Sequence, residues 1–171
     1  ITVSGGEALC QSKFVAQLLK ACKEEGMHTV LDTTGCVTWE TMEEVLPFVD
    51  LILFDVKNLD SNEHRRTTGA DNHLIMENLA RASKLVKVWL RVPLIADFND
   101  SEEQMKGIAC LARDTAAEKV SLLPYHEGGK SKCEQLGRPY LIPEAKAPND
   151  EHVEKLKEMI MGMGIKVTIG S

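Results

Sequence analysis

The stretch DLILFDVK, residues 50–57, contains the pattern that decides the fold. Its apolar run, residues 51–54, is typical of a short β-strand that is buried on both faces, as the strands of parallel sheets are. The run ends at Asp55 and Lys57, two charged residues at the point where such a strand would leave the sheet. We therefore expect a parallel strand with polar side chains at its carboxyl end.

Similar short apolar runs recur on both sides of this stretch, separated by longer segments of helical period. The expected strands cover residues 1–4, 28–32, 50–56, 86–93, 118–123 and 165–169. The expected helices cover residues 13–25, 38–48 and 73–84, a segment from about 101 to 115, and a last segment from 150 to Gly162 or Gly164. In the first helix, Phe14, Leu18, Leu19 and Cys22 share an apolar face, and Asn99-Asp100-Ser101 provides an N-cap for the fourth. This alternation predicts βα units and a parallel sheet.

Length and composition limit the fold and the function. The chain of 171 residues predicts a single domain, residues 1–171, and is shorter than the roughly 250 residues of a closed eight-unit barrel, so we expect a partial barrel or an open α/β sheet. With 26 acidic and 20 basic residues, the net charge of −6 argues against binding to nucleic acid or to an anionic membrane. Neither a membrane-spanning run nor a signal peptide is evident, and we expect a soluble, cytoplasmic protein.

The cysteines indicate neither disulfides nor a zinc site. Five of them, at positions 10, 22, 36, 110 and 133, are scattered without CxxC spacing, so free thiols are expected. The chain begins at Ile1, in a segment that already has the pattern of a strand. We interpret the sequence as a fragment whose edge at residues 1–4 is exposed and prone to pair with another chain.

Polar residues follow each of the first five expected strands, where the ligand sites of α/β folds lie. They are Ser4-Gly5-Gly6-Glu7, Asp32-Thr33-Thr34-Gly35, Asp55 with Lys57, Arg91, and Pro124-Tyr125-His126-Glu127. A rim of this composition suits a zwitterionic ligand, because the Gly-Gly backbone can approach an ammonium group while lysine and arginine meet a carboxylate. Each group also has an ordinary structural role open to it: a turn, a loop carboxylate or histidine, or a local ion pair.

Taken together and in this order, these motifs resemble the pyruvate formate-lyase activating enzyme family, the glycyl radical enzyme activating enzymes of the radical S-adenosylmethionine superfamily. The resemblance also includes Val88-Trp89-Leu90-Arg91-Val92-Pro93 and Gly128-Gly129-Lys130-Ser131-Lys132, and it covers nearly the whole chain. It implies a TIM-barrel-like partial (β/α) barrel, here without its first βα unit. It also implies an oxidoreductase that uses a [4Fe-4S] cluster and S-adenosylmethionine to make a 5′-deoxyadenosyl radical, which removes hydrogen from a glycine of a partner enzyme.

The resemblance implies a role for individual residues of the rim. The cofactor-binding residues would be Gly5, Gly6, Glu7, Asp32, Lys57, Arg91 and His126. A monovalent cation beside the cofactor would be held by Asp32, Thr33, Asp55 and the backbone of Leu53. The implied partners are a glycyl radical enzyme, such as pyruvate formate-lyase or a relative, and a flavodoxin or ferredoxin-type electron donor.

Two features depart from the family pattern. Ala8 stands where the family has a proline after Gly-Gly-Glu, and no CxxxCxxC motif for the cluster occurs anywhere in the chain. If Ile1 begins the second strand of the family fold, the cluster motif belongs to an omitted first strand and loop. We therefore expect this piece to lack activity by itself, with no catalytic residue of its own, and to bind S-adenosylmethionine weakly.

Two alternatives remain open at this point. One is an aldolase-like α/β barrel in which Lys57 forms a Schiff base after burial lowers its pKa. The other is a barrel without catalytic activity that serves as a binding module. Three cysteines with CxxxCxxC spacing upstream of Ile1 would favour the activating enzyme over the binding module.

Overall fold

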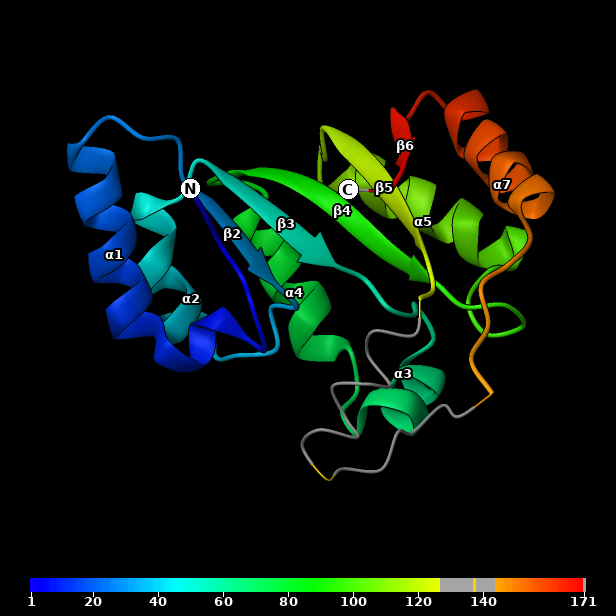
Figure 1. The fold of residues 1–171 in the computed structure, drawn as a ribbon, viewed down its shortest axis with the longest axis horizontal. Helices are drawn as coiled ribbons and strands as arrows, with labels where there is room; N and C mark the ends of the chain where they lie inside the picture. The colour runs from blue at the N-terminus through cyan, green and yellow to red at the C-terminus, as the bar shows by residue number, and fades with distance from the viewer. Residues whose placement is uncertain (127–136, 138–143, 171) are drawn as a thin grey trace.

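The computed structural model describes residues 1–126, 137 and 144–170 and contains a six-stranded parallel sheet in the order β1-β2-β3-β4-β5-β6 (Figure 1). The strands are β1 (Thr2–Val3), β2 (Val30–Thr33), β3 (Leu51–Asp55), β4 (Lys87–Leu94), β5 (Lys119–Pro124) and β6 (Val167–Ile169). Each strand pairs in parallel with the next one in sequence. All six lie where the sequence predicts strands, with ends that differ by one or two residues.

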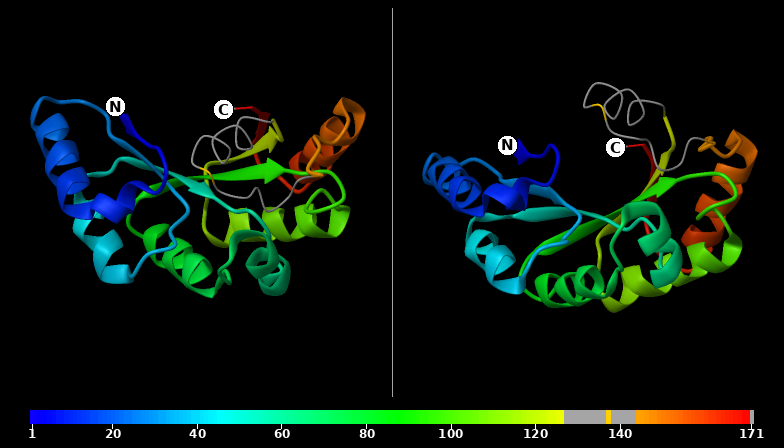
Figure 2. Two further views of the ribbon diagram at one scale, coloured as in Figure 1. Left: turned by 60° about the horizontal axis from the view of Figure 1, so that its bottom comes forward. Right: turned by 90° about the horizontal axis from the view of Figure 1, so that it is seen from below.

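Helices connect the strands and cover one face of the sheet, whereas the other face has no helix of the described chain over its centre (Figure 2). They are α1 (Ser12–Glu24), α2 (Trp39–Val45), α3 (Ser61–Thr68), α4 (His73–Ala82), α5 (Glu102–Asp114) and α7 (Asp150–Gly162), with short 3-10 turns at Ala8–Gln11 and Leu46–Phe48. None of the described helices has the length and apolar character needed to span a membrane.

Alternating side chains of the strands explain this asymmetry. In β4, Val88, Leu90, Val92 and Leu94 are buried, while Trp89, Arg91 and Pro93 between them are half-exposed. Because successive side chains of a strand point to opposite faces, the first set packs against the helices and the second lines the open face. The core therefore lies between the sheet and the helices, and the open face carries the half-exposed side chains of the strands.

The first helix packs differently from the expectation. Val15 and Leu19 are buried, but Phe14 is 61% exposed and Leu18 is 37% exposed. The predicted apolar face is therefore confirmed at Leu19 and wrong at Phe14 and Leu18. Val15 and Leu19 are four residues apart and share the side that faces the core, whereas Phe14 and Leu18 lie about 100° around the helix from that pair.

Helix α3 was missed by the sequence analysis. Its residues are almost all polar, and only His64 is buried, so no apolar stripe marks it. Its ends do have recognisable signals: the side chain of Asp60 accepts hydrogen bonds from the backbone N–H groups of Asn62 and Glu63, and Gly69 ends the helix with a φ of 86°. This helix stands at the carboxyl ends of the strands, beside the candidate site (Figure 1).

The N-terminal edge agrees with its expected exposure. Ile1 is 56% exposed, and the only pairing of β1 within the described part of the chain is with β2. Pairing of this edge with another chain stays a prediction.

Candidate functional site

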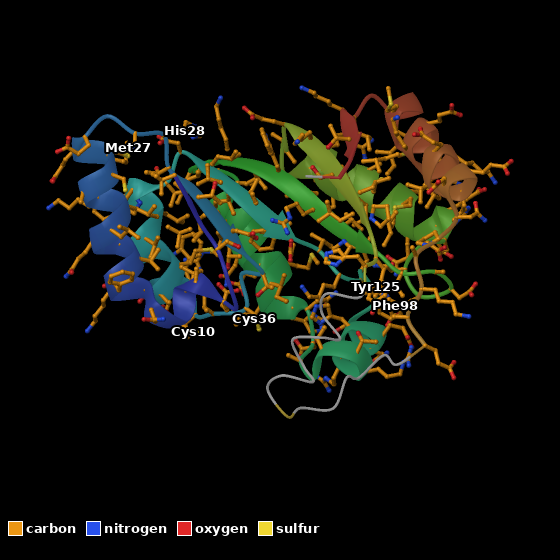
Figure 3. All side chains as sticks on the ribbon, in the orientation of Figure 1. Cys10, Met27, His28, Cys36, Phe98 and Tyr125 are labelled. Atoms are coloured by element: carbon orange, nitrogen blue, oxygen red, sulfur yellow. The ribbon has the colours of Figure 1, made fainter. Side chains whose placement is uncertain are left out.

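The polar residues predicted at the strand ends meet at one edge of the sheet. Figure 3 shows Cys36, Phe98 and Tyr125 at this carboxyl edge, and Met27 and His28 at the opposite one. Asp55 and Arg91 are register partners on neighbouring strands, and Asp32 lies on the next strand, opposite Leu53. The prediction that these side chains share a rim is therefore confirmed for the first four strands.

Five of these residues form a continuous row of contacts, which we call the charge row: Ser4, Asp32, Arg91, Asp55 and Lys57. The hydroxyl of Ser4 donates to Asp32 Oδ2 at 2.7 Å, and Arg91 Nη1 donates to the same oxygen at 2.7 Å. Arg91 Nε lies 3.2 Å from Asp55 Oδ1, and Lys57 Nζ lies 3.5 Å from Asp55 Oδ2. Arg91 thus spans two carboxylates from two other strands.

The pairing at the centre of the charge row is incomplete. Asp55 Oδ1 and Arg91 Nε are buried and make no hydrogen bond, because their close approach lacks hydrogen-bond geometry. Burial raises the pKa of Asp55 above its usual value, although Lys57 and Arg91 both act to lower it. Asp55 Oδ1 and Arg91 Nε are buried against each other, so their close approach joins β3 to β4 inside the protein, whereas the partly exposed ammonium of Lys57 beside them is a group that a ligand carboxylate could contact.

Glu7 holds the turn after β1. One of its carboxylate oxygens accepts from the hydroxyl of Thr33 at 2.7 Å and from the N–H of Leu9 at 3.1 Å. The other accepts from the N–H and the hydroxyl of Thr34 at 3.0 and 2.8 Å. Both oxygens are thus engaged within the protein, so Glu7 joins the β1 and β2 loops.

The two glycines before Glu7 leave their backbone open. Gly5 and Gly6 have φ values of 101° and 53°, and a Cβ atom added to either would meet no atom within 4 Å. The left-handed backbone explains why glycine occupies these positions, and the empty space beside it allows a ligand to approach the backbone. This arrangement suits the predicted contact with the ammonium group of a cofactor.

The remaining predicted residues are Thr33, the backbone of Leu53 and His126. Thr33 is buried, and its hydroxyl donates to Glu7 and accepts from the N–H of Gly35. His126 follows β5, while Glu127 and residues 128–132 lie outside the described residues. Asp32 and Asp55, the two carboxylates predicted to hold a monovalent cation, are paired with the side chain of Arg91. The cation site stays a prediction.

The described residues contain no group of three His, Cys, Asp or Glu side chains that could hold a metal ion. The four cysteines within this part of the chain, Cys10, Cys22, Cys36 and Cys110, are free thiols. An iron–sulfur cluster held by thiolates therefore does not fit the described residues.

The segment that carries Lys57 is held by carboxamide side chains from other parts of the chain. Asn99 Nδ2 donates to the carbonyls of Lys57 and Pro93 at 2.7 and 2.6 Å, and its Oδ1 accepts from the N–H of Ile95 at 2.8 Å. Asn72 Nδ2 donates to the carbonyls of Asn58 and Leu59. These contacts fix the direction in which the chain leaves β3.

Asn99 was expected only as part of a helix cap. The structure shows instead that the cap of α5 is Ser101, whose hydroxyl accepts from the N–H of Gln104, while Asn99 is 2% exposed. The sequence contains no separate signal for this role, because an Asn-Asp-Ser run before a helix is equally typical of a cap. Asn99 therefore acts as a buried link between the β3 and β4 ends.

We expect Asn99→Ala to lower the free energy of unfolding by about 2 kcal/mol, because it leaves two carbonyls and one N–H of the loops without their partner. Urea unfolding monitored by circular dichroism would measure the loss. The control is Asn149→Ala, which removes the exposed N-cap of α7 and its one hydrogen bond from the backbone N–H of His152. It should lower the free energy of unfolding by about 1 kcal/mol. Equal losses for the two variants would contradict the role of Asn99.

The comparison with known protein families decides where the chain belongs. The model of the radical SAM superfamily matches residues 1–107. The chain belongs to the radical SAM superfamily. Pyruvate formate-lyase 1-activating enzyme from Escherichia coli (strain K12) is 37% identical over 171 residues, which cover 98% of this chain and 70% of that protein. This result confirms the resemblance to the activating enzymes of that superfamily.

Other relatives carry names of the same kind. The 4-hydroxyphenylacetate decarboxylase activating enzyme from Clostridioides difficile (strain CD196) is 35% identical over 99% of this chain, and the indoleacetate decarboxylase activating enzyme from Tractidigestivibacter scatoligenes is also 35% identical over 99%. The chain spans 55% and 54% of the lengths of these two relatives. It therefore corresponds to about half of each of them.

A solved structure supports the radical SAM fold. The crystal structure of a domain of pyruvate-formate lyase-activating enzyme from Bacteroides vulgatus ATCC 8482 matches with a TM-score of 0.83 and 29% identity, covering 100% of this chain and 98% of that one. Streptococcus suis SuiB shares the fold with a TM-score of 0.77 at 15% identity. These matches confirm the predicted α/β fold of the radical SAM partial-barrel type, whereas the absence of a first βα unit stays a prediction.

Proposed function

We propose that this chain is the S-adenosylmethionine-binding part of an activating enzyme for a glycyl radical enzyme. The observation that carries the proposal is the 37% identity to an activating enzyme over 98% of the chain. The rim supports it, because the family cofactor has an ammonium group and a carboxylate, and the rim presents the open backbone of Gly5 and Gly6 together with the cations Lys57 and Arg91. The proposed partner is pyruvate formate-lyase or a related enzyme, and the proposed electron donor is a flavodoxin or ferredoxin.

In this proposal the residues of the chain bind and orient the cofactor. The backbone of Gly5 and Gly6 accepts from the ammonium group, and Lys57 and Arg91 meet the carboxylate. Asp32 and Asp55 hold Arg91 in place, and His126 borders the pocket. With a cluster held outside this chain, the bound cofactor would supply the radical chemistry by which the complete protein would act on a glycine of the partner. The ligands of the cluster are proposed to lie outside this chain, because no suitable group of side chains occurs among the described residues.

A Schiff-base role for Lys57 has less support. A lysine of that kind needs an apolar surrounding that favours the neutral amine. The side chain of Lys57 is 37% exposed and pairs with Asp55, so its surroundings are not apolar. We therefore do not propose the aldolase-like reaction.

The proposed function can be tested on the complete protein that contains this chain. After anaerobic reconstitution with iron and sulfide, reduction in the presence of S-adenosylmethionine should release 5′-deoxyadenosine, and a glycyl radical signal should appear in the electron paramagnetic resonance spectrum of added pyruvate formate-lyase or a relative. The 171-residue chain treated in the same way is expected to retain no iron and to give neither product. Failure of the complete protein to form 5′-deoxyadenosine would refute the proposal.

A further inference from the structure

A small cavity adjoins the charge row on the side of α3. It has a volume of about 200 Å³, and the residues around it include Thr34, Asp55, Lys57, His64, Ala70 and Ile75. We call it the His64 pocket. Sites for cofactors and other drug-sized ligands usually measure about 300–1,000 Å³, so this cavity is small for a cofactor and has the size of one amino acid side chain.

His64 has a fixed orientation in this pocket. The residue is 4% exposed, and Nδ1 lies 2.7 Å from the carbonyl oxygen of Ala70. Because a carbonyl can only accept, Nδ1 carries the proton, and in the neutral ring Nε2 is then an acceptor with a lone pair. No described residue forms a hydrogen bond with Nε2. The ring is among the residues that line the pocket, and Nε2, which keeps some accessible surface, offers an unused acceptor there.

The hydroxyl groups around the pocket already donate elsewhere. Thr34 Oγ1 donates to Glu7 at 2.8 Å, and Thr68 Oγ1 donates to the carbonyl of His64 at 2.8 Å. Lys57 is the cation at the pocket and is paired with Asp55. The ammonium of Lys57 would repel a cationic ligand group. A neutral group with a donor could form a hydrogen bond with His64 Nε2 without this repulsion. The wall is therefore suited to a hydroxyl.

We propose that the His64 pocket binds a hydroxyl-bearing side chain next to the target glycine of the partner, with His64 Nε2 accepting its proton in a hydrogen bond. The identity of the chain that supplies this side chain rests on the proposed function. Asp55 and Lys57 belong both to the charge row and to the pocket, and neighbouring Cα atoms of a peptide are only about 3.8 Å apart. In the proposed function the cofactor lies at the charge row with the target glycine next to it, so a residue that flanks this glycine can reach the pocket.

The 171-residue chain and two short peptides provide the first test. The probes are acetyl-Ser-Gly-Ser-amide and acetyl-Ala-Gly-Ala-amide, which place a hydroxyl, or none, on both sides of the glycine. The Nε2 resonance of His64 is followed by long-range ¹H–¹⁵N NMR. The serine peptide should shift this resonance in a saturable way and bind about fivefold more tightly than the alanine peptide, as expected for one neutral hydrogen bond. Equal affinity, or an unchanged Nε2 resonance, would overturn the proposal.

Variants separate the pocket from general effects on the fold. His64→Phe keeps a ring but removes the acceptor, so the fivefold preference for serine should disappear. His73→Phe changes an exposed histidine outside the pocket and should preserve the preference. If His64→Phe does not fold, Ala70→Leu keeps the backbone carbonyl that holds His64 and fills part of the pocket, and it should weaken binding of the serine peptide. Unweakened binding in that variant would refute the pocket.

The experiments distinguish a failure of the His64 pocket proposal from a failure of the proposed function. Loss of serine preference, with 5′-deoxyadenosine and the glycyl radical still formed by the complete protein, would refute the pocket and leave the function standing. Serine preference with no radical chemistry in the complete protein would refute the function, and with it the identity of the partner, while the hydroxyl site would be retained.

Discussion

Replacing Arg91 with methionine is expected to lower the free energy of unfolding by about 3 kcal/mol, because the change leaves two half-buried carboxylates without their shared cation. Asp32 and Asp55 are each 17% exposed at the side chain, and Arg91 is 22% exposed. Urea unfolding at neutral pH measures the loss. Arg113→Met, which removes an arginine that is 66% exposed and is paired with its neighbour Asp114, is the matched control and should be nearly neutral.

The pH dependence of the Arg91→Met variant provides an independent check. Burial already raises the pKa of Asp55, and the loss of Arg91 would raise it further, since Arg91 acts to lower it. A carboxyl group whose pKa is raised in the folded state favours folding below its unfolded pKa of about 3.9, and this advantage is lost as the pH rises through the folded pKa. The difference between wild type and variant should therefore shrink as the pH is lowered from 7 toward about 4. A constant difference would contradict the pairing.

The second large effect is expected for Gly35→Ala, with a loss of about 3 kcal/mol in the free energy of unfolding. A Cβ atom at this position would lie within van der Waals overlap of the ring of Phe54, which is fully buried in the core. The overlap costs about 1–3 kcal/mol, and the left-handed backbone, with a φ of 69°, adds about 1–2 kcal/mol. Thermal unfolding followed by circular dichroism would measure the combined loss.

Two other glycines separate these contributions. Gly26 has a φ of 72° and open space around it, so Gly26→Ala should show the backbone cost alone. Gly107 lies within α5, where a Cβ would meet the flexible end of Leu59, and the gain in helix propensity of up to about 1 kcal/mol offsets that contact. In a Gly35→Ala background, Phe54→Leu should restore part of the stability. Equal losses in the free energy of unfolding for Gly35→Ala and Gly26→Ala would contradict a destabilising contact with Phe54.

The sheet and the location of the site could be predicted because both follow from local patterns. Each strand is an apolar run of a few residues, and the polar residues that follow it must meet at the carboxyl edge of a parallel sheet. The alternation alone left the order of the strands open between a partial barrel and an open α/β sheet, and the partial barrel was implied by the family resemblance. Asp32, Asp55 and Arg91 therefore came together as expected from residue types and spacing alone.

What could not be predicted depends on contacts between distant elements. Whether Arg91 would reach across β3 to Asp32 is decided by the spacing of three strands, and no local pattern encodes it. Helix α3 has an almost entirely polar sequence without an apolar stripe, so no helix was predicted there. Asn99 has a buried role that is decided by backbone groups of two other loops.

The strand order described above also bears on how the chain acquires its structure. Every described strand pairs only with its immediate neighbours in sequence, so no strand must wait for a later one to be inserted between two earlier ones. A chain emerging from the ribosome could therefore extend its sheet one βα unit at a time, each new unit docking on a surface already in place. Pulse-labelling hydrogen exchange during refolding would reveal whether protection spreads along the sheet in that order or appears in all strands at once.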